Sequence, residues 1–297
     1  MTRGGRAGMA VMMEPATPPH PGPGLLAHEA QVRYGTVPRE LGGQAMPPGS
    51  IGLHADSFLL QTNTGYGFFY RKGEGVVIER DSGADPAEEV LWLNGSTYAA
   101  IAAINGFLPF HASAVVWNGR AYAFSGPSGA GKSTLSAALG RHGLPLLCDD
   151  TLVLDIADPA RVQCLPGHKR LKLTPQAIAL TGSTAQERVA AIIDKHYAEP
   201  PGGIIRQVLP LARLCFLEDG PEIAFTPIGG GERIARLNDD HYTAELFAQA
   251  RDEDFAARFA RIAAIAGHVP MTRLVRPRDA ARFDEVTARV AAWIKEN

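Results

Sequence analysis

The sequence predicts an α/β protein with a mixed sheet, preceded by a small β-rich part. A glycine-rich run with the spacing of a phosphate-binding loop lies between an apolar strand-like segment and an amphipathic helix. The dipeptide Asn118-Gly119, a strong hairpin signal, precedes that strand and argues against a purely parallel sheet. In the C-terminal third, apolar residues recur at helical spacing, as at Phe255, Phe259 and Ile262.

Composition and charge set the outer limits. The chain has 297 residues, of which 45% are hydrophobic and 20% charged, which suits a globular protein of one large or two small domains. A net charge of -2 gives no indication of a nucleic-acid partner. Three cysteines without paired or metal-like spacing predict a reduced, cytoplasmic protein. Because no apolar run approaches membrane-spanning length, no membrane partner is expected.

Changes in amino-acid composition along the chain predict three segments. Residues 1–50 are rich in proline and glycine and poor in large apolar side chains, so we expect a mobile, disordered leader. Residues 51–104 contain short β-rich runs separated by glycine turns, followed by a helix-like stretch from Thr97 to Asn105, and predict a small antiparallel sheet. Residues 105–297 form the predicted main domain.

The glycine-rich run predicts a phosphate-binding loop. It reads G-x-x-x-x-G-K-S-T from Gly126 to Thr134. In such a loop the backbone N–H groups turn toward a polyphosphate, Lys132 reaches the terminal phosphates, and the Ser133 hydroxyl ligates Mg²⁺. We therefore predict a bound nucleoside triphosphate, although no base-reading motif distinguishes ATP from the others. The predicted binding residues are Gly126, Ser128, Gly129, Ala130, Gly131, Lys132, Ser133 and Thr134.

An acidic pair follows the helix after this loop. Asp149 and Asp150 end an apolar run, and Asp150 comes eighteen residues after Lys132. Adjacent carboxylates at a strand end fit two roles, in which Asp149 holds Mg²⁺ and Asp150 accepts a proton from an attacking hydroxyl. The alternative is a solvated turn with an aspartate cap.

Two further polar segments are candidates. His111 begins the strand, over residues 111–117, that is predicted to pair with the one entering the loop, and this placement favours a position near the phosphates over a structural role. The run His168-Lys169-Arg170 follows a Pro-Gly turn and has two interpretations: it faces the nucleotide or an acidic peptide end, or it is a solvated strand edge.

The remaining elements are predicted from hydrophobic patterns. Residues 211–217 and 223–225 have the pattern of a hairpin around Asp219-Gly220. A strand over 271–275 and a last helix from about Asp279 follow.

The order and spacing of His111, the loop and the Asp149-Asp150 pair resemble the kinase domain of bacterial HPr kinase/phosphorylase, whose fold is shared with PEP carboxykinases. The resemblance implies that Lys132 contacts phosphates, Ser133 ligates Mg²⁺, Asp150 is the general base for a serine hydroxyl, and His111 lies by the transferred phosphate. It also implies ATP as the donor. The likeness is closer to the shorter lasso-peptide precursor kinases, which phosphorylate a serine near the end of a precursor peptide.

The chain also departs from that family. The stretch from Leu165 to Arg170 lacks the carboxylate that helps to bind metal in HPr kinases, and the phosphorylase loop is not recognisable, so phosphorylase activity is not expected. The expected function is an ATP-dependent serine kinase that acts on a peptide or protein. The alternatives are a small-molecule kinase of the same fold and a nucleotide-dependent binding module without phosphotransfer. The sequence leaves open whether the chain forms a homo-oligomer.

Overall fold

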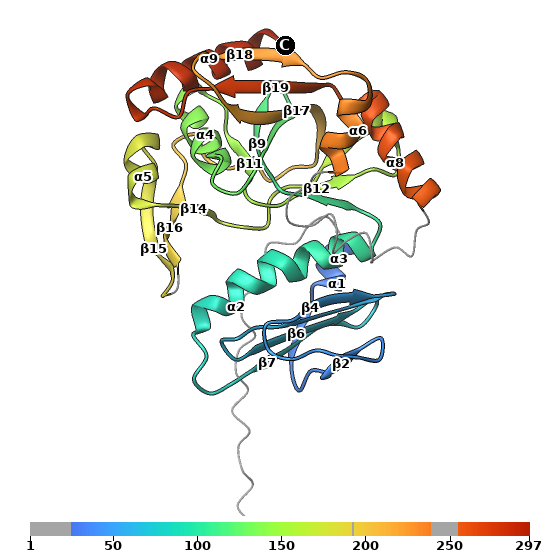
Figure 1. Ribbon diagram of the computed structural model, residues 1–297. Coiled ribbons are helices and arrows are strands. Elements are labelled where there is room, and N and C mark those ends of the chain that lie inside the picture. The colour runs from blue at the N-terminus through green and yellow to red at the C-terminus, as the bar shows by residue number, and fades with distance from the viewer. Residues whose placement is uncertain (1–24, 192, 239–254) are drawn as a thin grey trace, which may run out of the picture.

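The computed structural model describes residues 25–191, 193–238 and 255–297. Figure 1 shows a small sheet at one end, a long helical element across it, and a larger α/β part beyond that element. Residues 1–24 of the predicted leader lie outside the described residues. In the part of the chain that the structure describes, no helix is long and apolar enough to cross a membrane.

The small sheet has five strands in the order β1-β7-β6-β5-β4. Strands β4 to β7 pair in antiparallel fashion, as their turn-separated runs predict, and β1 joins β7 in parallel. The strands are β1 (Val32–Tyr34), β4 (Ile51–His54), β5 (Ser57–Gln61), β6 (Tyr66–Arg71) and β7 (Gly75–Arg80).

Residues 25–50 correct the predicted leader, because they form structure. Here lie helix α1 (Leu25–Glu29), strand β1 and a short hairpin of β2 (Glu40–Leu41) and β3 (Gln44–Ala45). Leu26 is buried in the core of the small sheet, and Val37 and Met46 are buried with residues of β5 and β7. These few apolar side chains are enough to order residues 25–50, because they extend a core that other strands already form.

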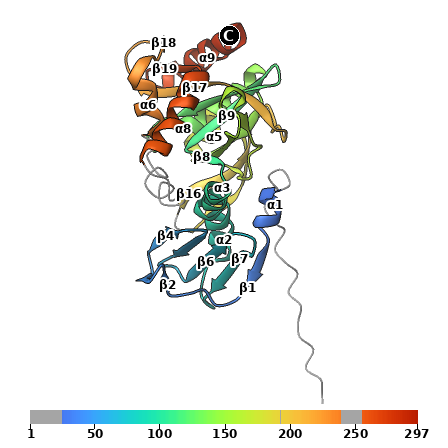
Figure 2. The ribbon, with the colours of Figure 1, turned by 90° about the vertical axis from the view of Figure 1, so that its right-hand side faces the viewer.

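A long helical element separates the two parts (Figure 2). It consists of α2 (Pro86–Trp92), the π-helix η1 (Leu93–Thr97) and α3 (Tyr98–Ile104). Asp85 caps its start by accepting a hydrogen bond from the Ala87 N–H, and a proline occupies the first turn. The alanine-rich α3 is buried against the small sheet and against Val153 and Leu165 of the larger part. The helical element is therefore core to both.

The large sheet has nine strands and is mixed, as predicted. Its main path runs β11-β9-β10-β17-β13-β12-β8, and β19 pairs with β17 and with β18. β10, β17 and β19 run parallel to one another, whereas the other neighbours are antiparallel. The strands are β8 (Leu108–Phe110), β9 (Ala112–Trp117), β10 (Arg120–Ser125), β11 (Leu146–Cys148), β12 (Leu152–Asp155), β13 (Gln163–Cys164), β17 (Leu209–Asp219), β18 (Ala224–Pro227) and β19 (Met271–Arg276).

The predicted hairpin around Asp219-Gly220 is wrong. β19 lies between the two strands and pairs with β17 in parallel and with β18 in antiparallel fashion. β19 buries Met271 and Leu274, so it is stable as an inner strand with a neighbour on each side. It therefore occupies the position next to β17 that the turn at Asp219-Gly220 had predicted for β18.

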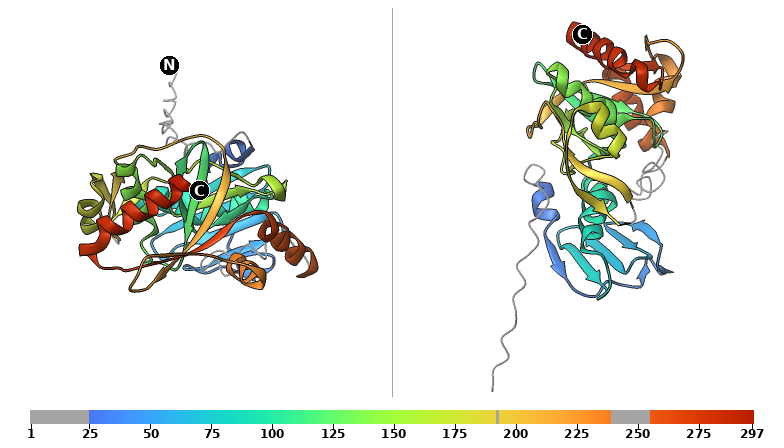
Figure 3. Two further views of the ribbon diagram at one scale, coloured as in Figure 1. Left: turned by 90° about the horizontal axis from the view of Figure 1, so that it is seen from above. Right: turned by 90° about the vertical axis from the view of Figure 1, so that its left-hand side faces the viewer.

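Helices cover both faces of the large sheet (Figure 3). Along β17, Leu214 and Phe216 pack with α8, whereas Cys215 and Leu217 pack with α4 and α9. This alternation is the period of two expected of a buried strand. The helices are α4 (Lys132–Leu139), α6 (Gly230–Asn238), α8 (Phe255–His268) and α9 (Phe283–Glu296), with short 3₁₀ turns η2 (Gly140–His142), η3 (Pro159–Arg161) and η5 (Ala280–Arg282).

A three-stranded sheet in the order β14-β16-β15 lies beside α4. It is built from β14 (Leu171–Leu173), β15 (Thr184–Ala190) and β16 (Ile193–Glu199), with α5 (Pro175–Thr181) packed on it. β15 contacts α2 of the helical element. This sheet therefore forms one side of the space between the helical element and the phosphate-binding loop.

Candidate active site

The glycine-rich run forms a tight loop between β10, which ends at Ser125, and α4, which begins at Lys132. Gly126, Gly129 and Gly131 have φ angles of 153°, 79° and 84°. L-residues with a side chain rarely adopt these angles, so the loop shape requires glycine at the three positions.

The Lys132 side chain folds back across the loop. Its Nζ donates to the main-chain oxygens of Gly126 and Pro127, at 2.7 and 3.2 Å, and the residue is 6% exposed. The N–H groups at the start of α4 lie beside it and carry partial positive charge. A helix start and an ammonium group at one loop form an arrangement able to bind phosphate.

Two arginines from the end of β19 hold the outside of the loop. Arg276 donates to the main-chain oxygen of Ala130, and Arg278 donates to that of Gly129 at 2.7 Å. Asp219, at the end of β17, lies 3.9 Å from Arg276 and 3.5 Å from Arg278. No role for these arginines could be predicted from the sequence, because the pairing of β19 with β17 brings them to the loop from far along the chain.

The acidic pair follows β11, and its two carboxylates point to different places. Asp149 is 2% exposed and accepts a 2.5 Å hydrogen bond from the Ser113 hydroxyl on β9. Asp150 has a φ of 70°, in the left-handed region that aspartate tolerates better than most residues. This turn sends the Asp150 carboxylate into a cavity rather than beside that of Asp149.

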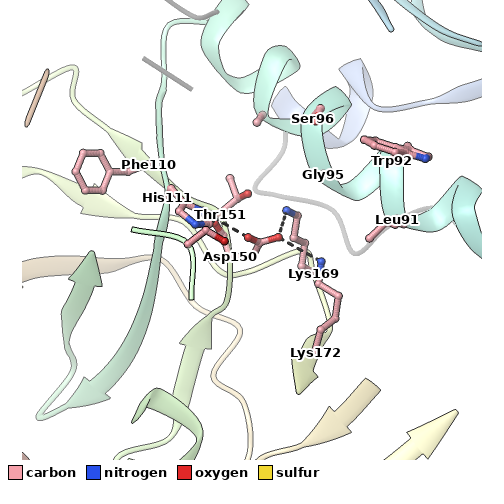
Figure 4. A pocket seen from close by; sticks show the side chains of 12 residues that line it. Leu91, Trp92, Gly95, Ser96, Phe110, His111, Asp150, Thr151, Lys169 and Lys172 are labelled. Atoms are coloured by element: carbon pink, nitrogen blue, oxygen red, sulfur yellow. Dashed lines mark hydrogen bonds and ion pairs between the residues drawn. The ribbon is translucent and has the colours of Figure 1, made fainter. Parts of the chain in front are cut away.

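Asp150 is surrounded by cationic or basic groups (Figure 4). Its Oδ2 accepts from Lys169 Nζ at 2.6 Å and from Lys172 Nζ at 3.3 Å. His111 Nδ1 donates to the main-chain oxygen of Asp150 at 2.9 Å and lies 3.4 Å from Oδ1. Burial raises the pKa of Asp150, but the two lysines outweigh it and hold this pKa well below its usual range. The carboxylate is therefore ionised at neutral pH.

The residues of the basic run lie in different places, because Lys169 contacts Asp150 in the cavity and Arg170 lies on the surface. Arg170 pairs with Glu187 at 2.5 Å on the surface. Gly167 brings this segment against the acidic pair, since a Cβ there would lie 2.7 Å from Cys148 Cα, and its N–H donates to the oxygen of Leu147. A glycine after a proline was the sequence signal for this close approach.

Lys172 is another residue of the candidate site that sequence reasoning missed. It lies on β14 between Leu171 and Leu173, which are both buried. Such alternation predicts a solvent-facing lysine. Instead, the opposite face of β14 closes the site, and the Lys172 side chain is 15% exposed.

A cavity of about 330 Å³ lies between Asp150 and the phosphate-binding loop. The helical element forms one wall, and the larger part forms the other. Its lining residues are Leu91, Trp92, Gly95, Ser96, Ala99, Phe110, His111, Ser128, Asp150, Thr151, Lys169 and Lys172. Ser128 belongs to the loop. A predicted phosphate-binding residue and the predicted base therefore line the same cavity.

The π-helix shapes the cavity wall. Gly95 departs from helical geometry, with φ and ψ of -90° and -110°. His168 Nε2 donates to the main-chain oxygen of Asn94 at 2.5 Å, and its ring lies 3.5 Å, centre to centre, from that of Tyr98. Burial lowers the pKa of His168 to about 3, so this histidine is neutral at physiological pH. It fixes the segment that carries Lys169 against the helical element.

A second hollow of about 250 Å³ lies on the other side of the loop. The predicted binding residues Ala130, Gly131 and Thr134 line this hollow, whereas Ser128 lines the cavity beside Asp150. The other lining residues are Leu135 of α4, Thr174, Gln176, Ala177 and Leu180 in or directly before α5, residues 276–280 at and after the end of β19, and Phe283 and Val286 of α9.

The predicted metal ligands are one hydroxyl, of Ser133, and one carboxylate, of Asp149. Within the described ranges, no three His, Cys, Asp or Glu side chains come together as a metal cage. Mg²⁺ at phosphate sites is usually held by one or two carboxylates together with the phosphate oxygens and water. The donor set therefore fits a Mg²⁺ ion that arrives with a nucleotide.

Comparison with protein-family models and with curated proteins found no match. Among solved structures, the chain is similar to the Hpr(Ser) kinase/phosphatase from Coxiella burnetii, with 12% sequence identity and a TM-score of 0.33. The similarity covers 63% of this chain and 88% of that chain. At this identity and TM-score it carries no argument, so the fold class follows from the mixed sheet described above and the function from the geometry of the site.

Proposed function

We propose that this chain is an ATP-dependent phosphotransferase of the HPr-kinase-like type, which moves the γ-phosphate of ATP to a hydroxyl group. The observation that carries the proposal is that Ser128 of the phosphate-binding loop lines one cavity with Asp150 and His111. A phosphate donor and a carboxylate that accepts a proton would then face the same volume, as in-line transfer requires.

The residues of the chain have separate roles in this mechanism. Lys132 and the N–H groups at the start of α4 bind the phosphates and neutralise charge that develops on them. Asp150 orients the acceptor hydroxyl and takes its proton at a carboxylate oxygen. The hydrogen bond from His111 to the Asp150 main chain keeps the strained turn in place, and His111 lies beside the transferred phosphate.

A bound Mg²⁺ would neutralise negative charge on the terminal phosphates, and Ser133 and Asp149 would hold it. The nucleoside would lie in the second hollow, which borders Gly131 directly. There Thr134 and Gln176 offer hydrogen bonds and Phe283 offers an apolar surface. ATP is the proposed triphosphate.

We propose a serine of a peptide or protein as the acceptor, and a lasso-peptide precursor is one such substrate. The resemblance noted from the sequence supports this choice. A small-molecule kinase is the second candidate, because the cavity beside Asp150, at about 330 Å³, is large enough for a small acceptor. A binding module without phosphotransfer would also bind ATP, and only transfer of phosphate distinguishes it.

The test uses ATP labelled in its γ-phosphate and Mg²⁺, with serine peptides, HPr and small alcohols as acceptors. Asp150→Asn is expected to lower transfer by about 100-fold or more, because it removes the proton acceptor, while ATP affinity stays unchanged. Asp194→Asn, on the exposed side of β16, is the matched control. Near-normal turnover by Asp150→Asn would refute the assigned base, and ATP binding without transfer to any acceptor would favour the binding module.

A further inference from the structure

The cavity beside Asp150 carries more positive charge than negative. Lys169 and Lys172 both bond to one oxygen, Asp150 Oδ2, at 2.6 and 3.3 Å (Figure 4). Among the described residues that line this cavity, Asp150 is the one carboxylate. The two lysine side chains are 9% and 15% exposed, so two ammonium groups share a single negative charge where little water reaches them.

One lysine would suffice for a structural ion pair. Burying a second ammonium group costs desolvation free energy. The Asp150 carboxylate compensates this cost only in part, because it also pairs with Lys169. Lys172 makes the longer contact of the two, and it sits on a strand whose neighbouring residues are packed in a core. Its charge is therefore held in the cavity by the fold, in a position where an incoming anion would be stabilised.

The two lysines approach Asp150 from the side opposite His111 (Figure 4). His111 lies by the other carboxylate oxygen, Oδ1, and directly precedes β9, which pairs with the strand that enters the loop. A smaller hollow borders both lysines on their side and is also lined by Val90 and Tyr197. This placement suits an acceptor better than the donor nucleotide.

We infer that the acceptor carries a carboxylate close to its reactive hydroxyl, and that Lys169 and Lys172 bind this carboxylate while Asp150 receives the hydroxyl. The inference rests on the proposed phosphotransfer function and names its substrate class. A hydroxyl bonded to Asp150 Oδ2 and a carboxylate bonded to either lysine would be at most about 9 Å apart, because the two new polar contacts measure about 2.7 Å each and the lysines lie 2.6 and 3.3 Å from Oδ2. Groups on one residue or on two adjacent residues meet this limit.

The transfer step needs only the acceptor hydroxyl, the Asp150 carboxylate and ATP. The acceptor O–H bond breaks and its proton goes to the Asp150 carboxylate, while the acceptor oxygen forms a bond to the γ-phosphorus. The bond from that phosphorus to the bridging oxygen of the β-phosphate breaks, and ADP leaves. The substrate carboxylate takes no part in bond changes, and its role is to place the hydroxyl.

The test measures binding separately from transfer, using the full chain and matched peptides. One pair is acetyl-Ser-Asp-amide and acetyl-Ser-Asn-amide, and the other is acetyl-Ala-Ser with a free or an amidated C-terminus. Ligand-observed NMR gives affinities for the wild type, Lys172→Met, Lys172→Arg and Lys195→Met. Lys195 is an exposed lysine on β16, in the same three-stranded sheet as Lys172. Circular dichroism checks that each variant is folded.

In at least one pair, the acidic peptide is expected to bind about tenfold or more tightly than its neutral partner. Lys172→Met should remove this preference, Lys172→Arg should retain it, and Lys195→Met should leave it unchanged. The pair that shows the preference tells a side-chain carboxylate from a terminal one.

Equal binding or no binding of both members of each pair would overturn the inference, as would a preference that survives Lys172→Met. If the pairs bind equally but Lys172→Met weakens the binding of inorganic phosphate, the lysines serve the phosphate instead. A carboxylate preference without transfer of labelled phosphate would contradict the proposed function and leave the anion site standing.

Discussion

At the scale of single residues, the backbone of Asp150 explains how adjacent carboxylates serve two places. Its φ of 70° turns the chain so that Asp149 stays buried beside Ser113 while Asp150 faces the lysines. Asparagine tolerates this conformation about as well as aspartate, whereas alanine does not. Asp150→Asn therefore tests the charge without adding backbone strain.

His168 predicts a pH dependence of stability. Its pKa is lowered by burial from 6.5 to about 3, so the folded chain keeps the ring neutral while the unfolded chain binds a proton below pH 6.5. Stability is therefore full above about pH 6.5 and falls as the pH drops toward 3, by about 1.4 kcal/mol per pH unit from this residue. His168→Gln keeps a donor for the Asn94 oxygen but does not titrate.

Urea unfolding at pH 7, 6 and 5 measures this effect. The wild type is expected to lose stability more steeply than His168→Gln below pH 6.5. The exposed His54→Gln is the control and should follow the wild type. Parallel pH curves for the wild type and His168→Gln would show that the folded protein accommodates the charged ring.

At the scale of elements, the phosphate-binding loop depends on a strand that comes about 140 residues later in the chain. Arg276 and Arg278 bond to the loop carbonyls of Ala130 and Gly129 from outside. These bonds fix the peptide planes of the loop. Because the N–H groups that would bind phosphate belong to the same planes, the arginines order the loop, and they also line the hollow in which the nucleoside is proposed to lie.

Arg278→Met is expected to lower ATP affinity by about tenfold, since it removes a charge-assisted hydrogen bond that orders the loop. The side chain is 55% exposed, so folding should change little. Isothermal titration with Mg²⁺–ATP measures the affinity, with the exposed Arg289→Met on α9 as the control. Unchanged affinity in Arg278→Met would mean that the loop keeps its shape without this bond.

The sequence predicted the elements better than their pairing. The loop, the β9–β10 hairpin at Asn118-Gly119 and the mixed sheet are encoded by glycines and by local apolar patterns, so the predictions were confirmed. The position of β19 depends on which strand buries most apolar surface as an inner strand. That depends on segments far apart in the sequence and cannot be predicted from a local pattern. For the same reason Lys172 was missed, because only the packing of β14 on α4 turns a surface-like pattern into a wall of the site.

At the scale of the whole molecule, the small sheet and the large α/β part share a core. Ile101 of α3 is fully buried in one cluster with Phe58 and Phe68 of the small sheet and with Val153 and Leu165 of the large part. The same helical element forms a wall of the cavity beside Asp150. The cavity beside Asp150 therefore exists only while the two parts stay packed together.

This shared core predicts a single unfolding transition, which Ile101→Ala shifts as a whole. The substitution is expected to cost about 2–5 kcal/mol, because it leaves a cavity where both parts meet. Trp92→Phe leaves tryptophan fluorescence from the large part, and Trp117→Phe with Trp293→Phe leaves it from the helical element. The two signals should share one midpoint, and Ile101→Ala should lower both equally. Ile51→Ala, at an exposed position on β4, should change the free energy of unfolding from either signal by no more than about 0.5 kcal/mol. Two separate midpoints would show that the parts unfold independently and that the cavity wall can detach.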